Sequence, residues 1–560
     1  MNKKIYFLTS LILLLYTNLK AQTFNWAGTY GGQSHDVVYK IHVDHEGNIY
    51  STGFYNDNCD FDPTEGSYIL EHSFDADIFV SKINKNGELV WAKSIGGLAN
   101  DSGKYITTDT EGNVYITGTF EETVDFDSGA GTFLLTSSGQ TDVFILKLDK
   151  NGNFIWAKSF EGEDIEQTAG IGLDHFGNIY IAGDFHGTVD FDPSTSIFSL
   201  TPKKDGEGYL AKLSTNGDFI WAKQFGGPGI VTTMKVLNDG STYISGLFDE
   251  TADFNPDNHV DFFLTVPDNY HGLYLLQLNS DGNFIKANTI ATTDFQCFTM
   301  DLDLDSEGAV IMTGYFSGKI QFEVPDSSIS SDILRMYYNS FVVKVNPNGQ
   351  NEWAKLLSSD LGFNTAMALA INKQDEALIY GYYAGSFSSN QITLTKFPSD
   401  NSAENYVLKI SNNGVTTSGL KFGGAMSVYS CAIKIDQAEN IYLSSGFQNT
   451  IDINPILKQT LQKTAINMVD SYIIKLNDNA LSIPDTYNET LIFYPNPTTN
   501  KIMITSKIPL NEKEYNLFDA TGKSVISGML DNSQSIDLSQ LTKGMYYIKI
   551  ENTTYKVMKK

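Results

Sequence analysis

The sequence predicts an all-β fold: a seven-bladed β-propeller with four-stranded blades, followed by a small C-terminal β-sandwich. The first observation is a stretch that recurs as "NGELVWAKSIGG" (86–97), "NGNFIWAKSFEG" (151–162) and "NGDFIWAKQFGG" (216–227). The five tryptophans follow the same period, at Trp26, Trp91, Trp156, Trp221 and Trp353, with steps of 65, 65, 65 and 132. Lys286 occupies the skipped position. Repeats of this kind indicate a repeat architecture.

A second series confirms the period and gives the number of units. It consists of seven glycines, Gly53, Gly118, Gly183, Gly246, Gly314, Gly381 and Gly446, at steps of 65, 65, 63, 68, 67 and 65. We expect these glycines to mark tight strand packing or a bulge. We expect the repeated aromatic residues to form the core rather than to stack on a ligand.

Each unit supplies four predicted strands. Residues 39–55 alternate apolar and polar residues on either side of an Asp-x-x-Gly-Asn turn, which predicts a hairpin. A loop of about 20 residues follows, which is long for a compact domain. The third strand covers 142–149 in the second unit, and Asn151-Gly152 turns it into the fourth strand through a type I′ turn.

The two ends of the repeat region distinguish a propeller from a solenoid. The first tryptophan strand has no preceding third strand, and the last unit ends at 471–479 without a tryptophan strand. We therefore expect Phe24–Thr29 to pair beside Tyr472–Leu476 and close a ring, which leaves no open sheet edge. A solenoid has repeats of about 20 to 45 residues and needs polar caps at both ends.

Composition and charge restrict the class of protein. The chain has 560 residues and a formal net charge of −28, which repels nucleic acid and anionic membranes. Residues 1–21 place Lys3 and Lys4 before a short apolar run, which predicts a cleaved signal peptide; the alternative is a buried first helix. The apolar run is too short for a transmembrane span. Three cysteines without metal spacing exclude a disulfide framework.

The long loops carry a repeated acidic motif, which is the candidate metal site. The motif places two oxygen-bearing side chains at i and i+2 with Phe between them, and in an extended chain both project to the same side. Ca²⁺ is the candidate ligand, because it takes six to eight oxygen atoms. The candidate residues in the first three loops are Asp60, Asp62, Asp125, Asp127, Asp190 and Asp192. The alternative is that these side chains bond to the backbone of the following turn.

Other acidic and catalytic signals are weaker. The run Asp301–Asp305 has three carboxylates on one face of a strand, and we expect that face to be solvated or to line the channel. No His-Glu-x-x-His, Gly-x-Ser-x-Gly or phosphate-binding glycine loop is present in the sequence. The unit from Lys286 to Trp353 departs most from the repeat, and we expect a site there first.

The C-terminal segment resembles a known family. Tyr494-Pro495-Asn496-Pro497, then Leu517-Phe518-Asp519, Ile536–Ser539 and Tyr546–Ile548 occur in the order of the type A C-terminal sorting domain of the Bacteroidetes type IX secretion system. This resemblance implies export through the secretion machinery, followed by surface attachment or release. The alternative is an ordinary ligand-binding sandwich. The repeats are similar to the SBBP type of β-propeller repeat, which implies a fold and no single activity.

These observations predict the domain organisation and a class of function. We expect a signal peptide at 1–21, a propeller at 22–479, a linker at 480–489 and the sorting domain at 490–560. The leading hypothesis is a secreted or cell-surface, non-catalytic binding or adhesion protein. It would act as a monomer and hold a glycan or protein ligand on its long-loop face. The alternatives are a secreted hydrolase or lyase that uses loop carboxylates, and a purely structural surface protein.

Overall fold

Every element of secondary structure in the described residues is a β-strand, which confirms the predicted all-β class. The computed structural model describes residues 24–71, 75–204, 206–257, 259–325, 327–332, 334, 336–390, 392–395, 403–423, 430–454, 461–477, 492–494, 496–505, 513–519, 522–530, 535–550 and 553–560. The chain divides into two compact units, 1–484 and 485–560. The predicted signal peptide and the predicted linker lie outside the described residues.

The first unit repeats one four-stranded antiparallel sheet, and we number these sheets I to VII by their first strands. Sheet I contains β2 (Asp36–Val43), β3 (Ile49–Tyr55), β6 (Asp77–Ile83) and β7 (Leu89–Ile95). Sheet II contains β8 (Ser102–Thr108), β9 (Val114–Phe120), β12 (Asp142–Leu148) and β13 (Phe154–Gly162). Sheet III contains β14 (Gly170–Leu173), β15 (Ile179–Phe185), β18 (Glu207–Leu213) and β19 (Phe219–Phe225). Sheet IV contains β20 (Gly229–Val236), β21 (Thr242–Asp249), β24 (His271–Leu278) and β25 (Phe284–Thr293).

The remaining sheets follow the same order of strands. Sheet V contains β26 (Cys297–Leu304), β27 (Val310–Phe316), β30 (Asn339–Val345) and β31 (Asn351–Leu357). Sheet VI contains β32 (Phe363–Ile371), β33 (Ala377–Ala384), β36 (Glu404–Ile410) and β37 (Thr416–Gly423). Sheet VII contains β38 (Cys431–Ile435), β39 (Asn440–Phe447), β42 (Asp470–Asn477) and, as its fourth strand, β1 (Phe24–Gly32).

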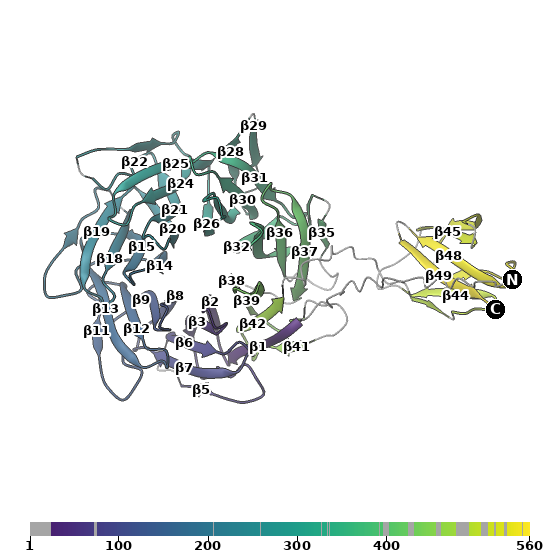
Figure 1. The fold of residues 1–560 in the computed structure, drawn as a ribbon, viewed down its shortest axis with the longest axis horizontal. Coiled ribbons are helices and arrows are strands. Elements are labelled where there is room, and N and C mark those ends of the chain that lie inside the picture. The colour runs from purple at the N-terminus through teal and green to yellow at the C-terminus, as the bar shows by residue number, and fades with distance from the viewer. Residues whose placement is uncertain are drawn as a thin grey trace, which may run out of the picture. The chain divides into compact units, whose positions relative to one another are not determined.

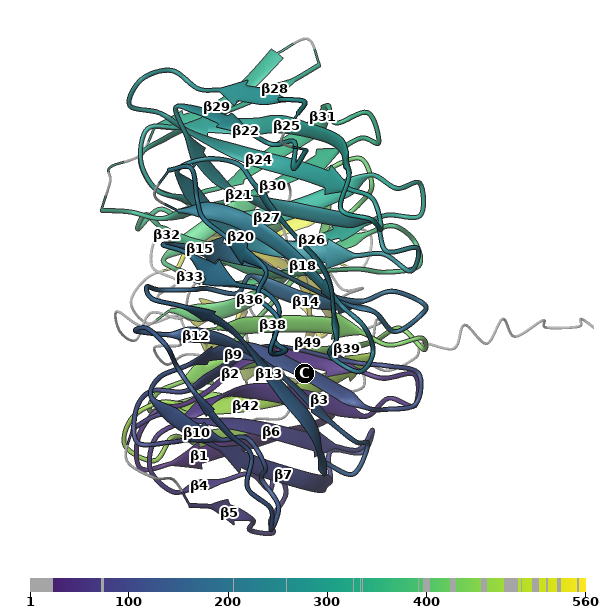
Figure 2. The same cartoon turned by 90° about the vertical axis from the view of Figure 1, so that its left-hand side faces the viewer.

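The two ends of the first unit meet in sheet VII. Strand β1 pairs antiparallel with β42, with Phe24 opposite Leu476 and Thr29 opposite Tyr472, so the pairing predicted from the sequence is confirmed. The first strand of each sheet contacts the first strand of the next, and β38 contacts β2. Figure 1 shows these first strands around the centre and the fourth strands β7, β13 and β19 outside. Figure 2 views the unit from its edge, with successive sheets side by side.

The repeated glycines occupy tight positions opposite a bulge. A Cβ on Gly53 would overlap the carbonyl oxygen of Val37 and press on the ring of Phe79. The register of β2 against β3 shifts between Val38 and Lys40, directly beside this glycine. The same shift recurs in β8, β20, β26 and β32. The prediction of tight strand packing or a bulge is therefore confirmed for five of the seven glycines, Gly53, Gly118, Gly246, Gly314 and Gly381, and the absent side chain is the physical reason for glycine.

The tryptophans connect each sheet to the next. The ring of Trp26 lies against Gly87, in the turn between β6 and β7, and the ring of Trp91 lies against Gly152 in the turn of sheet II. Packing against a neighbouring sheet is therefore confirmed. Both glycines have positive φ, 86° and 78°, whereas Asn86 and Asn151 before them do not. The predicted type I′ turn is therefore wrong, because it needs positive φ at both residues. The N–H of Gly152 donates instead to the carbonyl oxygen of Asp149 in a longer hairpin loop, and the glycine takes the left-handed position. The hydrophobic core lies between adjacent sheets, as in the cluster that joins Tyr50 of sheet I with Phe144 of sheet II.

The long loops differ from the expected irregular connections, because each contains a short hairpin. The hairpins are β4 (Cys59–Asp60) with β5 (Ile69–Leu70), β10 (Thr123–Asp125) with β11 (Leu134–Thr136), β16 (Val189–Asp190) with β17 (Ser199–Leu200), β22 (Thr251–Asp253) with β23 (Phe263–Thr265), β28 (Lys319–Val324) with β29 (Ser327–Asp332), β34 (Ser386–Ser389) with β35 (Ile392–Thr395), and β40 (Thr450–Asp452) with β41 (Gln462–Thr464). Each hairpin bonds to the end of the preceding sheet, either to its fourth strand or to a residue just beyond that strand. This pairing satisfies backbone groups that an irregular loop would leave to water.

The second unit contains two antiparallel sheets that share one hydrophobic core. One sheet contains β43 (Ile492–Tyr494), β44 (Lys501–Thr505) and β47 (Ser535–Asp537). The other contains β45 (Glu514–Asp519), β46 (Ser524–Met529), β48 (Gly544–Ile550) and β49 (Thr553–Lys559). Ile502 and Ile536 of the first sheet pack with Leu517 and Ile548 of the second.

Candidate functional site

The first aspartate of each acidic motif closes its own loop. In the first loop, Asp60 Oδ1 accepts the N–H groups of Asp62 at 3.0 Å and Tyr68 at 2.8 Å. Asp125 and Asp190 repeat this pattern with the corresponding residues of the second and third loops. The phenylalanine between the two acidic positions is fully buried in all three loops. The first aspartate therefore holds a reverse turn while the phenylalanine anchors it to the core.

The second aspartate bonds to the residue two positions further on. Asp62 Oδ1 accepts the N–H and the hydroxyl of Thr64, Asp127 accepts the N–H of Gly129, and Asp192 accepts that of Ser194. These are the backbone bonds that the alternative interpretation predicts. Among the described residues, no three Asp, Glu, His or Cys side chains gather in a way that could hold a metal ion. A Ca²⁺ ion here would need backbone or water oxygens, and calcium binding stays a prediction.

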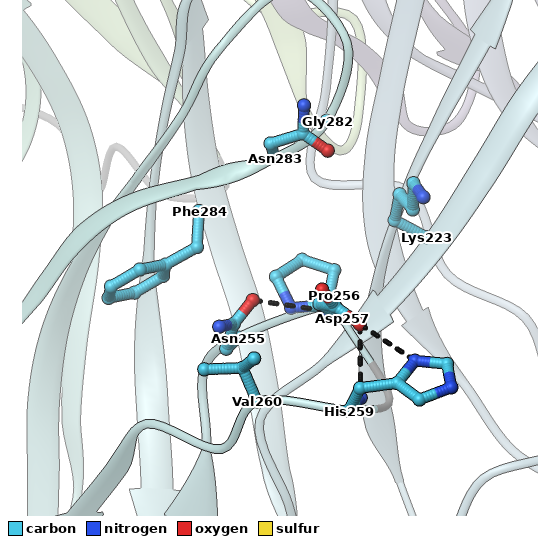
Figure 3. Close-up of a pocket in the computed structure, with 9 residues that line it drawn as sticks. All are labelled: Lys223, Asn255, Pro256, Asp257, His259, Val260, Gly282, Asn283 and Phe284. Carbon is cyan, nitrogen blue, oxygen red and sulfur yellow. Dashed lines mark hydrogen bonds and ion pairs between the residues drawn. The ribbon is translucent and has the colours of Figure 1, made fainter.

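A groove of about 520 Å³ lies on the outside of sheets III and IV. Three segments form it: Lys223 of β19, the turn Gly282–Phe284 that leads into β25, and part of the loop between β22 and β23, namely Asn255–Asp257, His259 and Val260. Figure 3 shows Lys223 on one side of the groove and Asn255 and Phe284 on the other, with the ring of Phe284 directed away from Lys223. The groove therefore combines a cation, an amide and an aromatic wall.

Hydrogen bonds within the loop order the polar side of the groove. Asn255 Oδ1 accepts the N–H of Asp257 at 3.1 Å, and Asp257 Oδ1 accepts the N–H of His259 at 3.0 Å (Figure 3). The imidazole Nδ1 of His259 lies 3.1 Å from the same carboxylate oxygen. These bonds from His259 lower the pKa of Asp257. The His259 side chain is 91% exposed, so its ring is accessible to a ligand.

The aromatic side of the groove repeats along the outside of the ring. The ring of Phe284 lies 4.6 Å from that of Phe262. The corresponding pairs are Phe154 with Phe133 at 5.1 Å in sheet II, and Phe219 with Phe198 at 4.8 Å in sheet III. Phe263 and Val260 beside the groove are exposed. Only the loop of sheet IV adds Asp257 and His259 to this repeated aromatic pair.

The loop that forms this groove differs in spacing from the loop of sheet II, and the sequence shows this difference. Asp253 bonds to Phe262, nine positions later, whereas Asp125 bonds to Phe133, eight positions later. The loop of sheet VII has the same nine-residue spacing, from Asp452 to Leu461, so the extra residue alone does not identify the groove. The predicted location, the unit from Lys286 to Trp353, contains part of a second groove of about 360 Å³, lined by Leu334, Tyr337, Asn339 and Ser358–Gly362. Lys223, His259 and Phe284 were not among the candidate residues.

The acidic run of β26 lies partly at the centre of the ring. Asp303 Oδ1 lies 2.8 Å from Lys235 Nζ of sheet IV, and Asp301 Oδ2 lies 3.9 Å from Lys40 Nζ of sheet I. Both carboxylates therefore meet cations from other first strands, consistent with the predicted channel face. Asp305 differs, because it follows the end of β26 and accepts the N–H groups of Glu307 and Ala309.

Two family comparisons match parts of the chain. Residues 492–560 match the family described as "Secretion system C-terminal sorting domain", and residues 90–119 match the family described as "Beta-propeller repeat". The second match begins in β7 and ends in β9, so it spans one tryptophan strand and the hairpin after it. Both resemblances found in the sequence are confirmed. Among the described residues, no helix has the length and hydrophobicity that a membrane crossing requires.

The curated relatives are distant and longer than this chain. An uncharacterised WD repeat-containing protein of Acanthamoeba polyphaga mimivirus is 23% identical over 451 residues, which cover 66% of this chain and 32% of the relative. The regulatory protein FlaEY of Caulobacter vibrioides is 23% identical over 180 residues, which cover 31% of this chain and 18% of the relative. The aligned regions thus span a third or less of either relative's length.

The similar solved structures have low TM-scores and low sequence identity to this chain. A protein of unknown function from Bacteroides caccae is 12% identical with a TM-score of 0.26, covering 59% of this chain and 94% of that one. A polysaccharide lyase described as an ulvan lyase is 12% identical with a TM-score of 0.38, covering 80% of this chain and 97% of that one. The family matches carry more information, and they show that the chain contains a β-propeller repeat and a type IX C-terminal sorting domain and is a secreted or cell-surface protein.

Proposed function

We propose that the protein is a non-catalytic binding protein, exported by the type IX secretion system, that holds a glycan chain in the groove between β19 and the β22–β23 loop. The observation that carries this proposal is the composition of that groove, with Lys223, Asn255, Asp257, His259 and Phe284 around one space. Sugars combine hydroxyl groups with apolar C–H faces. Amide, imidazole and ammonium groups bond to the hydroxyls, and an aromatic ring packs against the C–H face.

The architecture that we propose for this protein is a closed propeller with seven blades, one for each of sheets I to VII, followed by a β-sandwich at 485–560. The pairing of β1 with β42 and the contact of β38 with β2 support a closed ring. The shared core of the two C-terminal sheets supports the sandwich. A rigid ring suits a binding protein, because side chains on ordered strands lose little freedom when a ligand binds.

A hydrolase or lyase is the alternative, and the described groove supports it less. Glycoside hydrolysis uses two carboxyl groups that flank the scissile bond. The residues that line the groove include one carboxylate, Asp257, and His259 bonds to it. The aspartates of the long loops accept backbone hydrogen bonds that hold their turns. The third alternative, a purely structural protein, predicts no specific ligand.

The test is binding of the mature full-length chain to an array of neutral, uronate-containing and sulfated polysaccharides. We expect binding that weakens by about tenfold or more in Lys223→Ala and in His259→Ala. The matched control is Lys158→Ala, which removes the lysine at the equivalent position of sheet II and should leave the affinity unchanged. Absence of binding to every polysaccharide at millimolar concentration would contradict the proposal, and release of reducing or unsaturated sugar ends would identify an enzyme instead.

A further inference from the structure

Buried carboxyl groups recur at the junctions between successive sheets. One set lies at or just before the first strand of a sheet, at Asp36, Asp101 and Glu166, in steps of 65 residues. The other set begins the third strand of the preceding sheet, at Asp470, Asp77 and Asp142. None of these six residues is more than 3% exposed.

Backbone bonds place the two sets beside each other. The N–H of Asp36 donates to the carbonyl oxygen of Val469 at 2.7 Å, next to Asp470. The N–H of Asp101 donates to Ala76, next to Asp77, and that of Glu166 donates to Thr141, next to Asp142. Each junction therefore contains a pair of acids. The pairs join sheets VII and I, sheets I and II, and sheets II and III.

The glycines at the end of the fourth strand leave room for these acids. A Cβ on Gly31 would overlap the carboxylate of Asp470, and one on Gly96 would overlap that of Asp77. A Cβ on Gly162 would overlap the carboxylate of Glu166. The glycine ending of the repeated tryptophan stretch therefore has a physical cause. Without it, the two carboxyl groups of each junction would have no space.

The two members of a pair differ in their hydrogen bonds. Asp470 Oδ2 accepts the N–H of Ile466 at 3.1 Å, and Asp142 Oδ2 accepts that of Ser138 at 3.0 Å. Among the described residues, the carboxyl oxygens of Asp36 and Glu166 have no hydrogen bond of full geometry, although the N–H of Gly32 and the thiol of Cys59 lower the pKa of Asp36. Asp101 differs, because it accepts the N–H groups of Gly97 at 2.8 Å and Glu121 at 3.2 Å. Two ionised carboxylates only accept hydrogen bonds and repel each other, whereas one added proton turns the contact into a donor–acceptor bond.

Among the described residues, the charges that most affect the pKa values of Asp36, Asp101 and Glu166 are negative. Asp36 is influenced by Asp470, the thiol of Cys59 on β4, and Asp57. Glu166 is influenced by Asp142 and Asp164, and Asp101 by Asp77 and Glu121. Burial, followed for Asp36 by the charge of Asp470, raises the pKa of Asp36 to about 8. Burial raises the pKa of Asp101 to about 7 and that of Asp470 to about 6, and it also raises the pKa of Glu166.

We propose that each of these three junctions is a proton-binding site, in which one proton shared by two buried carboxyl groups joins successive sheets, and that alkaline pH loosens the ring there first. The junction of sheets VII and I is also where β1 closes the ring. This proposal is independent of the glycan groove, because none of the six acids lines it.

The direction of the pH effect follows from linkage. A carboxyl group with a raised pKa binds its proton more tightly in the folded chain than in the unfolded chain. The stabilisation of the folded chain by the proton on Asp36 is therefore complete below pH 3.8, the ordinary pKa of the side chain. It is lost as the pH rises through the raised pKa of about 8. Between these two pH values, the folded chain holds one proton more than the unfolded chain at each such site. Each rise of one pH unit therefore lowers the equilibrium constant for folding about tenfold per extra proton.

The test is the unfolding of the full chain at several pH values between about pH 5 and about pH 9. Asp36→Asn and Glu166→Gln replace the protonated carboxyl with an amide that donates at every pH. We expect both variants to be more stable than the parent at the alkaline end, with a flatter dependence on pH. Glu163→Gln is the matched control, because it removes an equal charge from an exposed residue beside the same junction and should keep the parent profile.

Hydrogen exchange of the unmodified chain tests the proposal without any variant. The junction of sheets V and VI has Asn339 and Asn364 where these three junctions have acids, and the N–H of Asn364 donates to Tyr338 in the same way. After correction for intrinsic rates, we expect β1 and β42 to lose protection at alkaline pH while β30 and β32 keep it. Equal loss at all junctions would overturn the proposal. Recovery of protection on adding Ca²⁺ would assign the site to a cation instead.

Discussion

Trp26 of β1 donates its indole N–H to the carbonyl oxygen of Lys85, at 3.0 Å, in the turn between β6 and β7 of the next sheet. Trp91 makes the same bond to Lys150 at 3.1 Å, and Trp353 makes it to Asn412 at 2.9 Å. The partners are 59 residues apart in every case. In these three sheets, one tryptophan thus fastens the sheet to its neighbour.

This contact predicts a large effect of Trp91→Ala on stability. The substitution removes a mostly buried ring and the N–H that bonds to Lys150, so we expect unfolding free energy to fall by about 3 to 5 kcal/mol. Calorimetric unfolding would show the loss as a lower Tm. Val90→Ala is the control, because that neighbouring side chain is exposed. Similar Tm values for the two variants would contradict the role of the tryptophan.

The two aspartates of a loop should contribute different amounts to the stability of the protein. Asp125 accepts two backbone N–H groups and Asp127 accepts one. We expect Asp125→Ala to cost about 3 kcal/mol and Asp127→Ala about half as much, because each bond to a carboxylate contributes roughly 1.5 kcal/mol. Urea unfolding of the two variants measures the difference. A larger loss in Asp127→Ala would show that its carboxylate has a role beyond the turn.

Calcium binding by the same loops remains open to direct measurement. We expect the mature chain to take up Ca²⁺ at millimolar concentration in calorimetry, through two carboxylates per loop and additional oxygen atoms. Asp60→Asn together with Asp62→Asn should remove the uptake that belongs to the first loop. If the parent chain binds no Ca²⁺, the carboxylates serve only the backbone bonds described above.

The sorting domain predicts the fate of a truncated chain. In a bacterium that has the type IX system, a chain ending at residue 484 should cross the inner membrane and accumulate in the periplasm. The full chain should reach the surface or the medium, because residues 492–560 carry the sorting domain. Fractionation followed by immunoblotting distinguishes the two. Equal amounts outside the cell would show that export does not depend on this domain.

Local signals in the sequence determined much of the fold. The alternation of apolar residues, the Asn-Gly turns and the 65-residue period act within one unit, so they predict the strands of each sheet from nearby residues alone. The unpaired strands at 24–29 and 472–476 predict their own pairing, because each lacks the neighbour that the other supplies. The order of the C-terminal motifs likewise identifies the sorting domain.

Only the tertiary structure decided the sites. Lys223, Asp257 and Phe284 come from three segments that meet because the β22–β23 hairpin bonds to the end of sheet III rather than to its own sheet. Asp36 and Asp470 are 434 positions apart, and they become a pair only when the ring closes. A periodic sequence specifies each sheet through local contacts. The side chains that meet between sheets depend on how the sheets stack, and no local pattern contains that information.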